Sequence, residues 1–494
     1  MSAMRATDAA APPCEADSRR GRIQPGEVHL RMYWRDGLGV TLAAALGLAA
    51  GDASALPGKH TWSRSFGDTA QQWVEDVAVD AAGNTLLVGE YDGAAFHLGG
   101  GVLPPNNYFH NLYLAKLDGA GAHVWSRAIL GVSDDDFGFV SYERRLAVDG
   151  TGNILVAGNY YGTPDFGCGP LAQAQGSVVV VKLDASGACV WSRGFPGAYV
   201  ESPRIAVDGT GRVAVAGFFR GTLDFGGGAL GSTQGLFLAR LSATGGHLWS
   251  KRFEATEGTL APGALGVAAD ATGNVFLTGG FSGFLSLGGT PMRSRGGQDL
   301  FIGRFNPTGG LNWGRRFGDA ADQVGHGIAV DATGNIVLTG GFGGVMAVDT
   351  VSLTAQSASD AFVVKLDPTG HGTWGRNFTD ATGTQVGTQV AVDAAGNIAT
   401  SGHFTGYINL GAGPLDIEGD FKRYVAKLDG TGALVWGLGF VNEGYDFDTR
   451  IAADAAGDVR VAGSYTGQAW FYGDLFSSQG GSGYYDIFVA RFRD

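Results

Sequence analysis

Two acidic loops hold the residues whose type and spacing come closest to a metal site. They are Asp134, Asp135 and Asp136 in one loop and Glu443, Asp446 and Asp448 in the other. Clustered carboxylate oxygens are the ligands that Ca²⁺ takes in proteins. Neither loop has the spacing of an EF-hand or of a Gly-Gly-x-Gly-x-Asp repeat, so we interpret both as solvated acidic loops and keep Ca²⁺ as the alternative.

A second set of aspartates recurs in stretches such as "IAVDATGNIVLTGGF", which begins at Ile328. The set is Asp80, Asp149, Asp208, Asp270, Asp331, Asp393 and Asp454. Asp and Asn side chains close tight turns, and Gly supplies the positive φ that such turns need. An apolar run, a turn of this kind and a second apolar run predict a β-hairpin. We interpret these aspartates as turn formers and not as catalytic or metal-binding residues.

The histidines form no catalytic arrangement. His60, His123 and His247 each stand two residues before a tryptophan, where other copies of the stretch have Cys, Leu or Gly. A position that accepts such different residues is typical of a structural role. The sequence also lacks the G-x-S-x-G and H-E-x-x-H motifs. We therefore assign no catalytic and no cofactor-binding residue.

The recurring aspartates mark seven copies of one unit, numbered here as repeats 1 to 7 in chain order. They are 69, 59, 62, 61, 62 and 61 residues apart, and a nearly fixed period indicates repeated supersecondary units. A second hairpin follows the first, as in "VVVKLDASGACVWSRGF" from Val179, so each repeat has four strands. Consecutive apolar residues in the second strand indicate a sheet that is buried on both faces.

The two ends of the array complement each other. The last copy stops at "FVARFRD", from Phe488 to Asp494, without a fourth strand, and "KHTWSRSF", from Lys59, matches a fourth strand with no third before it. Pairing these segments would close a ring and protect both edges. The sequence predicts an all-β fold, a single seven-bladed β-propeller with four antiparallel strands per blade. The N-terminal strand completes the last blade and closes the ring.

Side-chain size agrees with a ring. The first strands are small and branched, and each fourth strand carries a tryptophan: Trp62, Trp125, Trp191, Trp249, Trp313, Trp374 and Trp436. Because blades converge at the axis and separate at the rim, the tryptophans are expected to fill the rim by packing.

One basic residue stands in every third strand. These residues are Lys116, Lys182, Arg240, Arg304, Lys365, Lys427 and Arg491. First and third strands run in the same direction, so each cation should lie near the turn aspartate of its repeat. The sequence predicts one charge pair per blade, worth about 0–1 kcal/mol where it is exposed.

The net charge of −13 and the pI near 5.1 argue against nucleic acid and anionic membrane surfaces as partners. Residues 32–55 carry a basic flank, a short apolar run and Ala-Ser-Ala, which is the pattern of a cleaved signal peptide. The apolar run is shorter than the ~20 residues of a membrane span. We expect residues 1–31 to be a polar segment that is non-native or disordered and residues 56–494 to be the propeller. The protein is then secreted, periplasmic or at the cell surface.

Cys168 and Cys189 both lie in repeat 2. In an exported protein, a local disulfide and two unpaired small residues are both compatible with this spacing.

The Asp-x-x-Gly-Asn hairpin and the "KLD..G...W" hairpin resemble the β-propeller repeat of secreted bacterial proteins, the seven-bladed type, and are similar to NHL-type repeats. The resemblance covers residues 59–494. It implies an extracytoplasmic propeller and brings no shared reaction, cofactor or site residue.

The connections from second to third strands and between repeats are longer and more varied than the hairpin turns, so we expect any binding surface on their face. The first hypothesis is a secreted, monomeric, non-enzymatic module that binds or scaffolds a protein or polysaccharide. The alternative is an extracytoplasmic carbohydrate-active or quinoprotein-like enzyme with a site on these loops. "KLDASGACVW" resembles the tryptophan-docking repeat of quinoproteins, with one residue fewer between Asp and Gly. A purely structural surface protein is the third hypothesis.

Overall fold

The computed structural model describes residues 58–494, apart from 94, 106–110, 133–143, 232–233, 416, 418–421, 442–448, 472–473 and 482. The polar segment, the predicted signal peptide and all six acidic metal candidates lie outside the described residues. The described strands all belong to the compact unit Ala53–Asp494.

Every repeat supplies a first, second, third and fourth strand. The first strands are β2 (Gln72–Val79), β6 (Arg144–Val148), β10 (Ala198–Val207), β15 (Leu260–Ala269), β21 (Gln323–Val330), β27 (Gln385–Val392) and β33 (Arg450–Ala453). The second are β3 (Thr85–Tyr91), β7 (Ile154–Asp165), β11 (Val213–Gly221), β16 (Val275–Phe281), β22 (Ile336–Phe342), β28 (Ile398–Phe404) and β34 (Val459–Tyr465). The third are β4 (Asn111–Leu117), β8 (Ala174–Leu183), β12 (Gly235–Leu241), β19 (Asp299–Phe305), β25 (Asp360–Leu366), β31 (Lys422–Leu428) and β37 (Asp486–Arg493). The fourth are β5 (His123–Val132), β9 (Cys189–Phe195), β13 (His247–Phe253), β20 (Leu311–Phe317), β26 (Gly372–Phe378), β32 (Leu434–Val441) and, from the N-terminal end, β1 (Lys59–Phe66).

The fold is all-β and built from antiparallel sheets, as a β-propeller repeat requires. In the described residues these strands form five four-stranded sheets and one eight-stranded sheet, in which β5 pairs with β7 and so joins repeats 1 and 2. The order β1-β37-β34-β33 places the first strand of the chain beside the last, from the pair Lys59 and Arg493 to the pair Phe66 and Ile487. The predicted pairing of the two chain segments is therefore present.

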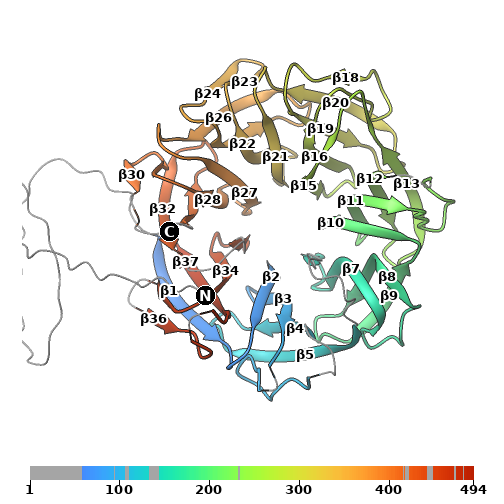
Figure 1. Ribbon diagram of the computed structural model, residues 1–494, viewed down its shortest axis with the longest axis vertical. Helices are drawn as coiled ribbons and strands as arrows, with labels where there is room; N and C mark the ends of the chain where they lie inside the picture. The colour runs from blue at the N-terminus through green and yellow to red at the C-terminus, as the bar shows by residue number, and fades with distance from the viewer. Residues whose placement is uncertain are drawn as a thin grey trace, which may run out of the picture. The chain divides into compact units, whose positions relative to one another are not determined.

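Within a repeat the strands are ordered outward from the centre, first strand innermost and fourth strand outermost, as β10 to β13 show in green in Figure 1. Each first strand contacts the first strand of the next repeat. The contacting pairs are β2–β6, β6–β10, β10–β15, β15–β21, β21–β27, β27–β33 and β33–β2.

Connections from second to third strands are less irregular than the sequence suggested. Several contain short paired strands: β17 (Phe284–Leu285) with β18 (Met292–Arg293), β23 (Val345–Val348) with β24 (Val351–Thr354), β29 (Ile408–Asn409) with β30 (Pro414–Leu415), and β35 (Gln468–Phe471) with β36 (Asp474–Ser477). In the connections of repeats 2, 3 and 6, one side chain, Asp165, Asp224 or Asn409, accepts two glycine N–H groups. Leu287 and Leu410 from these connections are buried in the core.

The repeated aspartates close turns, as predicted. In repeat 5, Asp331 Oδ1 accepts the N–H groups of Thr333 and Asn335 at 3.0 and 2.9 Å, and Oδ2 accepts the Asn335 side chain at 2.8 Å. Burial opposes ionisation of Asp331, but these hydrogen bonds, with help from Lys365, lower its pKa to about 2. An aspartate in this position is a fixed anion that can hold a cation.

The predicted charge pairs are present in six repeats. They are Lys116–Asp80 (2.8 Å), Lys182–Asp149 (2.9 Å), Arg240–Asp208, Arg304–Asp270 (3.8 Å), Lys365–Asp331 (3.2 Å) and Lys427–Asp393 (3.7 Å). Repeat 7 differs, because Asp458 replaces the turn asparagine and pairs with Arg491, while Asp454 pairs with Arg460 at 3.4 Å. Most of these groups are buried, so the small value expected for exposed pairs does not apply, and removing one partner would leave a buried charge.

Several of the tryptophans link one repeat to the next by hydrogen bonds. Trp62, Trp191 and Trp249 Nε1 each donate to a carbonyl in the next repeat's second hairpin turn at 3.0 Å, on Gly119, Ala243 and Pro307. Some charge pairs reach the same turns: Lys116 Nζ and Trp125 Nε1 both donate to Ala185 O. We call this arrangement of cation and tryptophan against the neighbouring turn the inter-repeat clasp.

Cys168 and Cys189 form a disulfide that links the connection between β7 and β8 to the start of β9. This resolves the alternative left by the sequence. His123 and His247 hydrogen-bond Ser126 and Ser250 at 3.0 and 3.1 Å, which agrees with a structural position.

Two glycines with the same backbone conformation allow the clasp to be tested. Gly432 has φ of 85° and a Cβ there would lie 2.9 Å from the Trp374 ring, whereas Gly396 has φ of 84° and open space around it. G396A should lower the free energy of unfolding by about 1–2 kcal/mol through backbone strain alone. G432A should cost about 1–3 kcal/mol more, because it also displaces the tryptophan.

Urea unfolding of the two variants measures the difference. Equal losses for G396A and G432A would show that Trp374 does not press on the neighbouring turn.

Candidate functional site

A cleft of about 440 Å³ lies between repeats 3 and 4 on the face of the varied connections. Its volume is within the roughly 300–1,000 Å³ of small-molecule sites. One wall comes from β10 and β11, and the other from the segment between β13 and β15. The location agrees with the face on which the sequence places binding.

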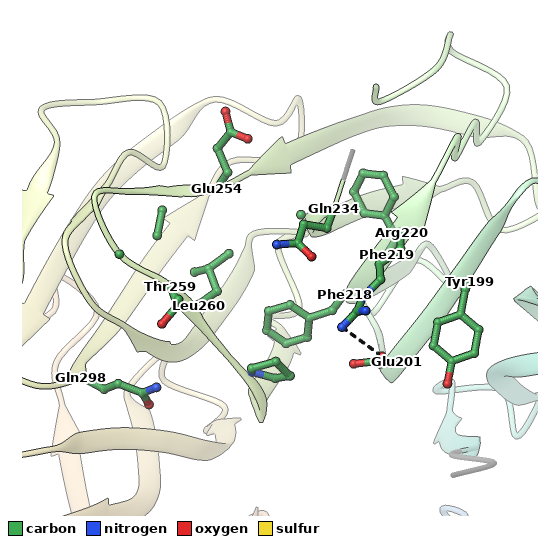
Figure 2. Close-up of a pocket in the computed structure, with 14 residues that line it drawn as sticks. Tyr199, Glu201, Phe218, Phe219, Arg220, Gln234, Glu254, Thr259, Leu260 and Gln298 are labelled. Atoms are coloured by element: carbon green, nitrogen blue, oxygen red, sulfur yellow. Dashed lines mark ion pairs between the residues drawn. The ribbon is translucent and has the colours of Figure 1, made fainter. Parts of the chain in front are cut away.

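Antiparallel register brings the first wall together. Tyr199 is paired with Arg220 and Glu201 with Phe218 across β10 and β11, and all four side chains lie on one face of the sheet because Val200 and Phe219 take the other. Arg220 lies 3.8 Å from Glu201 along the diagonal. Figure 2 shows this pair beside Phe218, which points toward Leu260 of the opposite wall.

The chain bends where the first wall ends. The register of β10 shifts between Glu201 and Arg204, and Ser202 has a φ of 51°. Pro203 fits there because a β-bulge does not need its missing N–H. Bulges of this kind redirect side chains beside binding sites.

The second wall is anchored to repeat 4. The short strand β14 (Ala255–Thr256) pairs with β17, and Ser282 N donates to Thr259 O at 2.8 Å. Glu254 pairs with Arg252, and Glu257 has a φ of 57°. Of the three non-glycine residues with positive φ in the described chain, Ser202 and Glu257 flank this cleft. Backbone outliers of this type cluster at functional sites.

The cleft therefore presents two aromatic rings, two arginine-paired carboxylates and the amides of Gln234 and Gln298 to solvent. The rings can pack on the flat apolar face of a ligand, while the carboxylates accept and the amides both accept and donate hydrogen bonds.

A second cavity, of about 210 Å³, lies where the first strands meet. Each repeat contributes to its lining the residue at the same position of its first strand: Asp76, Arg145, Arg204, Gly266, Gly327, Gln389 and Arg450. Asp76 and Arg204 of this set join adjacent repeats: Asp76 Oδ2 accepts a hydrogen bond from Leu146 N at 2.8 Å, and Arg204 Nε donates to Leu265 O at 2.9 Å. We interpret this cavity as structural.

A buried ionic cluster joins repeats 1 and 2. Arg144 Nη1 lies 2.9 Å from Glu75 Oε1 and also pairs with Glu90, and the three side chains are at most 10% exposed. Burial raises the pKa of Glu75 to about 8; Arg144 opposes this shift and Glu90 adds to it. Arg144 thus serves two buried carboxylates, and although Arg145 also lowers the pKa of Glu75, burial outweighs both arginines and favours retention of a proton.

The structure does not place the six predicted metal candidates, and among the described residues no group of three or more His, Cys, Asp or Glu side chains could hold a metal ion. The described part of the chain also has no helix with the length and apolar character needed to cross a membrane.

The cleft residues were not identified from the sequence, although a signal exists. The residue before the aromatic that ends each copy of the repeated stretch is Glu90, Asn159, Phe218, Gly280, Gly341, His403 or Ser464. Phe218 is the one large apolar residue in this series, and it points into the cleft (Figure 2).

No protein-family model matches the chain. It is 21% identical over 431 residues to an uncharacterized WD repeat-containing protein of Acanthamoeba polyphaga mimivirus, a match that covers 70% of this chain and 30% of that protein. The chain thus spans less than a third of the length of that relative. The match is consistent with a β-propeller repeat fold and names no ligand.

Solved structures are similar only at low scores. The polysaccharide lyase Uly1 is 10% identical with a TM-score of 0.44, covering 88% of this chain and 99% of its own. An α-L-arabinanase of Penicillium chrysogenum is 12% identical with a TM-score of 0.37, covering 76% and 100%. A Dyadobacter fermentans protein of unknown function is 11% identical with a TM-score of 0.37, covering 74% and 99%. These scores assign no activity to this chain.

The buried cluster generates a pH dependence. In the unfolded chain Glu75 releases its proton near pH 4.5, whereas in the folded protein it keeps the proton to about pH 8. The free energy of unfolding should therefore fall as pH rises through this window, by up to about 1.4 kcal/mol per pH unit for one proton. E75Q should flatten the curve.

Urea unfolding between pH 4 and 9 measures the effect, and E254Q, an exposed carboxylate change, should leave the wild-type curve unaltered. Parallel curves for wild type and E75Q would show that Glu75 ionises normally in the folded protein.

Proposed function

We propose that this protein is an exported, monomeric, closed seven-bladed β-propeller that binds an uncharged glycan without catalysis, in the cleft between repeats 3 and 4. The observation that carries the proposal is the pairing of Tyr199 and Phe218 with charged and amide groups in one open cleft. A protein ligand or a loop-borne carbohydrate-active or quinoprotein-like enzyme is the competing interpretation.

The closed ring is supported by contacts at its ends. The first strands contact one another in a complete cycle that includes β33 and β2. Arg491 Nη1 and Trp62 Nε1 both donate to Gly119 O, at 2.6 and 3.0 Å, so repeat 7 contacts repeat 1 through the same clasp that joins other neighbouring repeats. Seven sequence repeats then give seven blades.

Export is supported by the signal-peptide pattern in residues 32–55 and by the disulfide, since such bonds persist in oxidising compartments. This fits the resemblance to repeats of secreted bacterial proteins and to NHL-type repeats. Ca²⁺ in the two acidic loops stays a separate proposal, which a melt with and without the ion tests.

Glycan binding is supported by the chemistry of the walls. Tyr199 and Phe218 are half-buried, so each ring is held by packing and keeps an accessible part. A sugar ring has an apolar C–H face and hydroxyl edges, which match an aromatic surface surrounded by carboxylates and amides. Glu201 and Glu254 lie next to arginines, and their carboxylate oxygens can accept hydrogen bonds from sugar hydroxyls.

The charge balance favours an uncharged glycan. Each cleft carboxylate has an arginine beside it, so the cleft adds no strong field of its own. The chain carries a net charge of −13, and such a field disfavours the approach of polyanionic chains.

Calorimetric titration of the full chain tests the proposal. The probes are neutral gluco-, xylo-, manno- and arabino-hexasaccharides, with hexagalacturonate as the anionic control. One neutral class should bind without being cleaved. F218L, which keeps apolar packing but removes the ring, should weaken binding by about 2 kcal/mol, as for a central contact residue.

Tyr407 provides the matched control, because it is an aromatic side chain 39% exposed on repeat 6 and outside the cleft. Y407L should bind as wild type does. Equal affinity of F218L and wild type would show that the glycan does not bind in the cleft. Release of product from any probe would favour the enzyme interpretation.

A further inference from the structure

An open hollow of about 470 Å³ adjoins the cleft and shares Tyr199 with it. Its lining comes from Gln173 just before β8, from Gln175 and Ser177 at the start of β8, and from the turn between β9 and β10. Tyr199 therefore lines both the cleft and the hollow.

The position of the Tyr199 ring depends on β8. A Cβ at Gly176 would lie 2.6 Å from Tyr199 Cδ2, and this glycine has a φ of 73°. The missing side chain leaves room for the tyrosine ring to lie across the strand. Any other residue at 176 would displace the ring from the boundary between the two hollows.

Amide side chains continue the polar lining into the second hollow. Gln173 and Gln175 are exposed, while Ala174 and Gly176 between and after them are buried, so the two amides lie on the same side of the strand. The second hollow thus repeats the chemistry of the first, with amides beside an aromatic ring, and its residues carry no charge.

We infer that the cleft and the hollow form one groove for a linear neutral polysaccharide, with a sugar ring over Tyr199 and chain segments on both sides. The inference rests on the proposed glycan-binding function. It adds that the ligand is a polymer bound along its length and not a terminal sugar or disaccharide held in the cleft alone.

Occupation of both hollows by one chain makes the second contact intramolecular. Linking two binding segments raises affinity on the order of 100-fold when the linker spans the sites without strain. A hexasaccharide that reaches both hollows should therefore bind much more tightly than the disaccharide of the same sugar, which fills one.

The experiment compares the full chain with its Q173A/Q175A variant by calorimetric titration with the di- and hexasaccharide of the neutral class that binds. Wild type should bind the hexasaccharide at least ~10-fold more tightly, and the variant should lose most of this gain while its disaccharide affinity stays unchanged. Q468A, an exposed amide on β35, is the matched control and should behave as wild type.

Each outcome decides a different point. Equal affinity for the two lengths, or an unchanged hexasaccharide affinity in Q173A/Q175A, would overturn the groove and leave a cleft-only site. Absence of binding by every neutral hexasaccharide would overturn the proposed function together with the groove. Thermal melts of both variants should match wild type, because the changed side chains are exposed.

Discussion

The structure depends on one recurring interaction, the clasp of a buried cation and a tryptophan against the turn of the next repeat. A β-hairpin buries too little surface to be stable alone, so each four-stranded unit needs its neighbours. The turn aspartate is held ionised by backbone N–H groups, as at Asp331, and this anion fixes the cation. Carbonyl oxygens of the following turn then accept hydrogen bonds from the cation or from the indole N–H, as at Ala185.

This interaction divides the molecule into two faces with different freedom. Residues on the hairpin-turn face are constrained by the clasp in almost every repeat, so substitutions there disturb the joints between repeats. The connections on the opposite face take no part in the clasp. The first strands of repeats 1, 3, 4, 5 and 6 all shift register near that face, and repeat 3 differs in placing Ser202, a non-glycine residue with a φ of 51°, within the shift at the edge of the cleft. A binding site can arise there without loss of the scaffold.

The sequence predicted much of the fold because each element repeats. The turn aspartates, the charge pairs and the pairing of Lys59–Phe66 with Asp486–Arg493 all followed from spacing. The pairing in repeat 7 was not predicted, because Arg491 pairs with Asp458 and the turn aspartate Asp454 pairs with Arg460. The difference required knowledge of which side chains meet across strands, which spacing alone does not contain.

The candidate site was less predictable, because it consists of departures from the repeat. Phe218 and Tyr199 are 19 positions apart in the chain and come together only through the register of β10 with β11. The acidic clusters that the sequence offered as candidates, Asp134–Asp136 and Glu443–Asp448, lie outside the described residues. The connections from second to third strands were expected to be long and varied, but Asp165 and Asn409 close turns there with the same side-chain chemistry as the hairpins.

Hydrogen exchange of the β1 amides tests most directly whether the clasp closes the array. β1 pairs with β37 and carries Trp62, whose indole N–H donates to Gly119 O of repeat 1. If the array is closed, amides of Lys59–Phe66 should exchange as slowly as those of β13 and β20, which are fourth strands inside the array. Rapid exchange in β1, with protection retained in β13 and β20, would contradict closure and leave repeat 7 as an open edge.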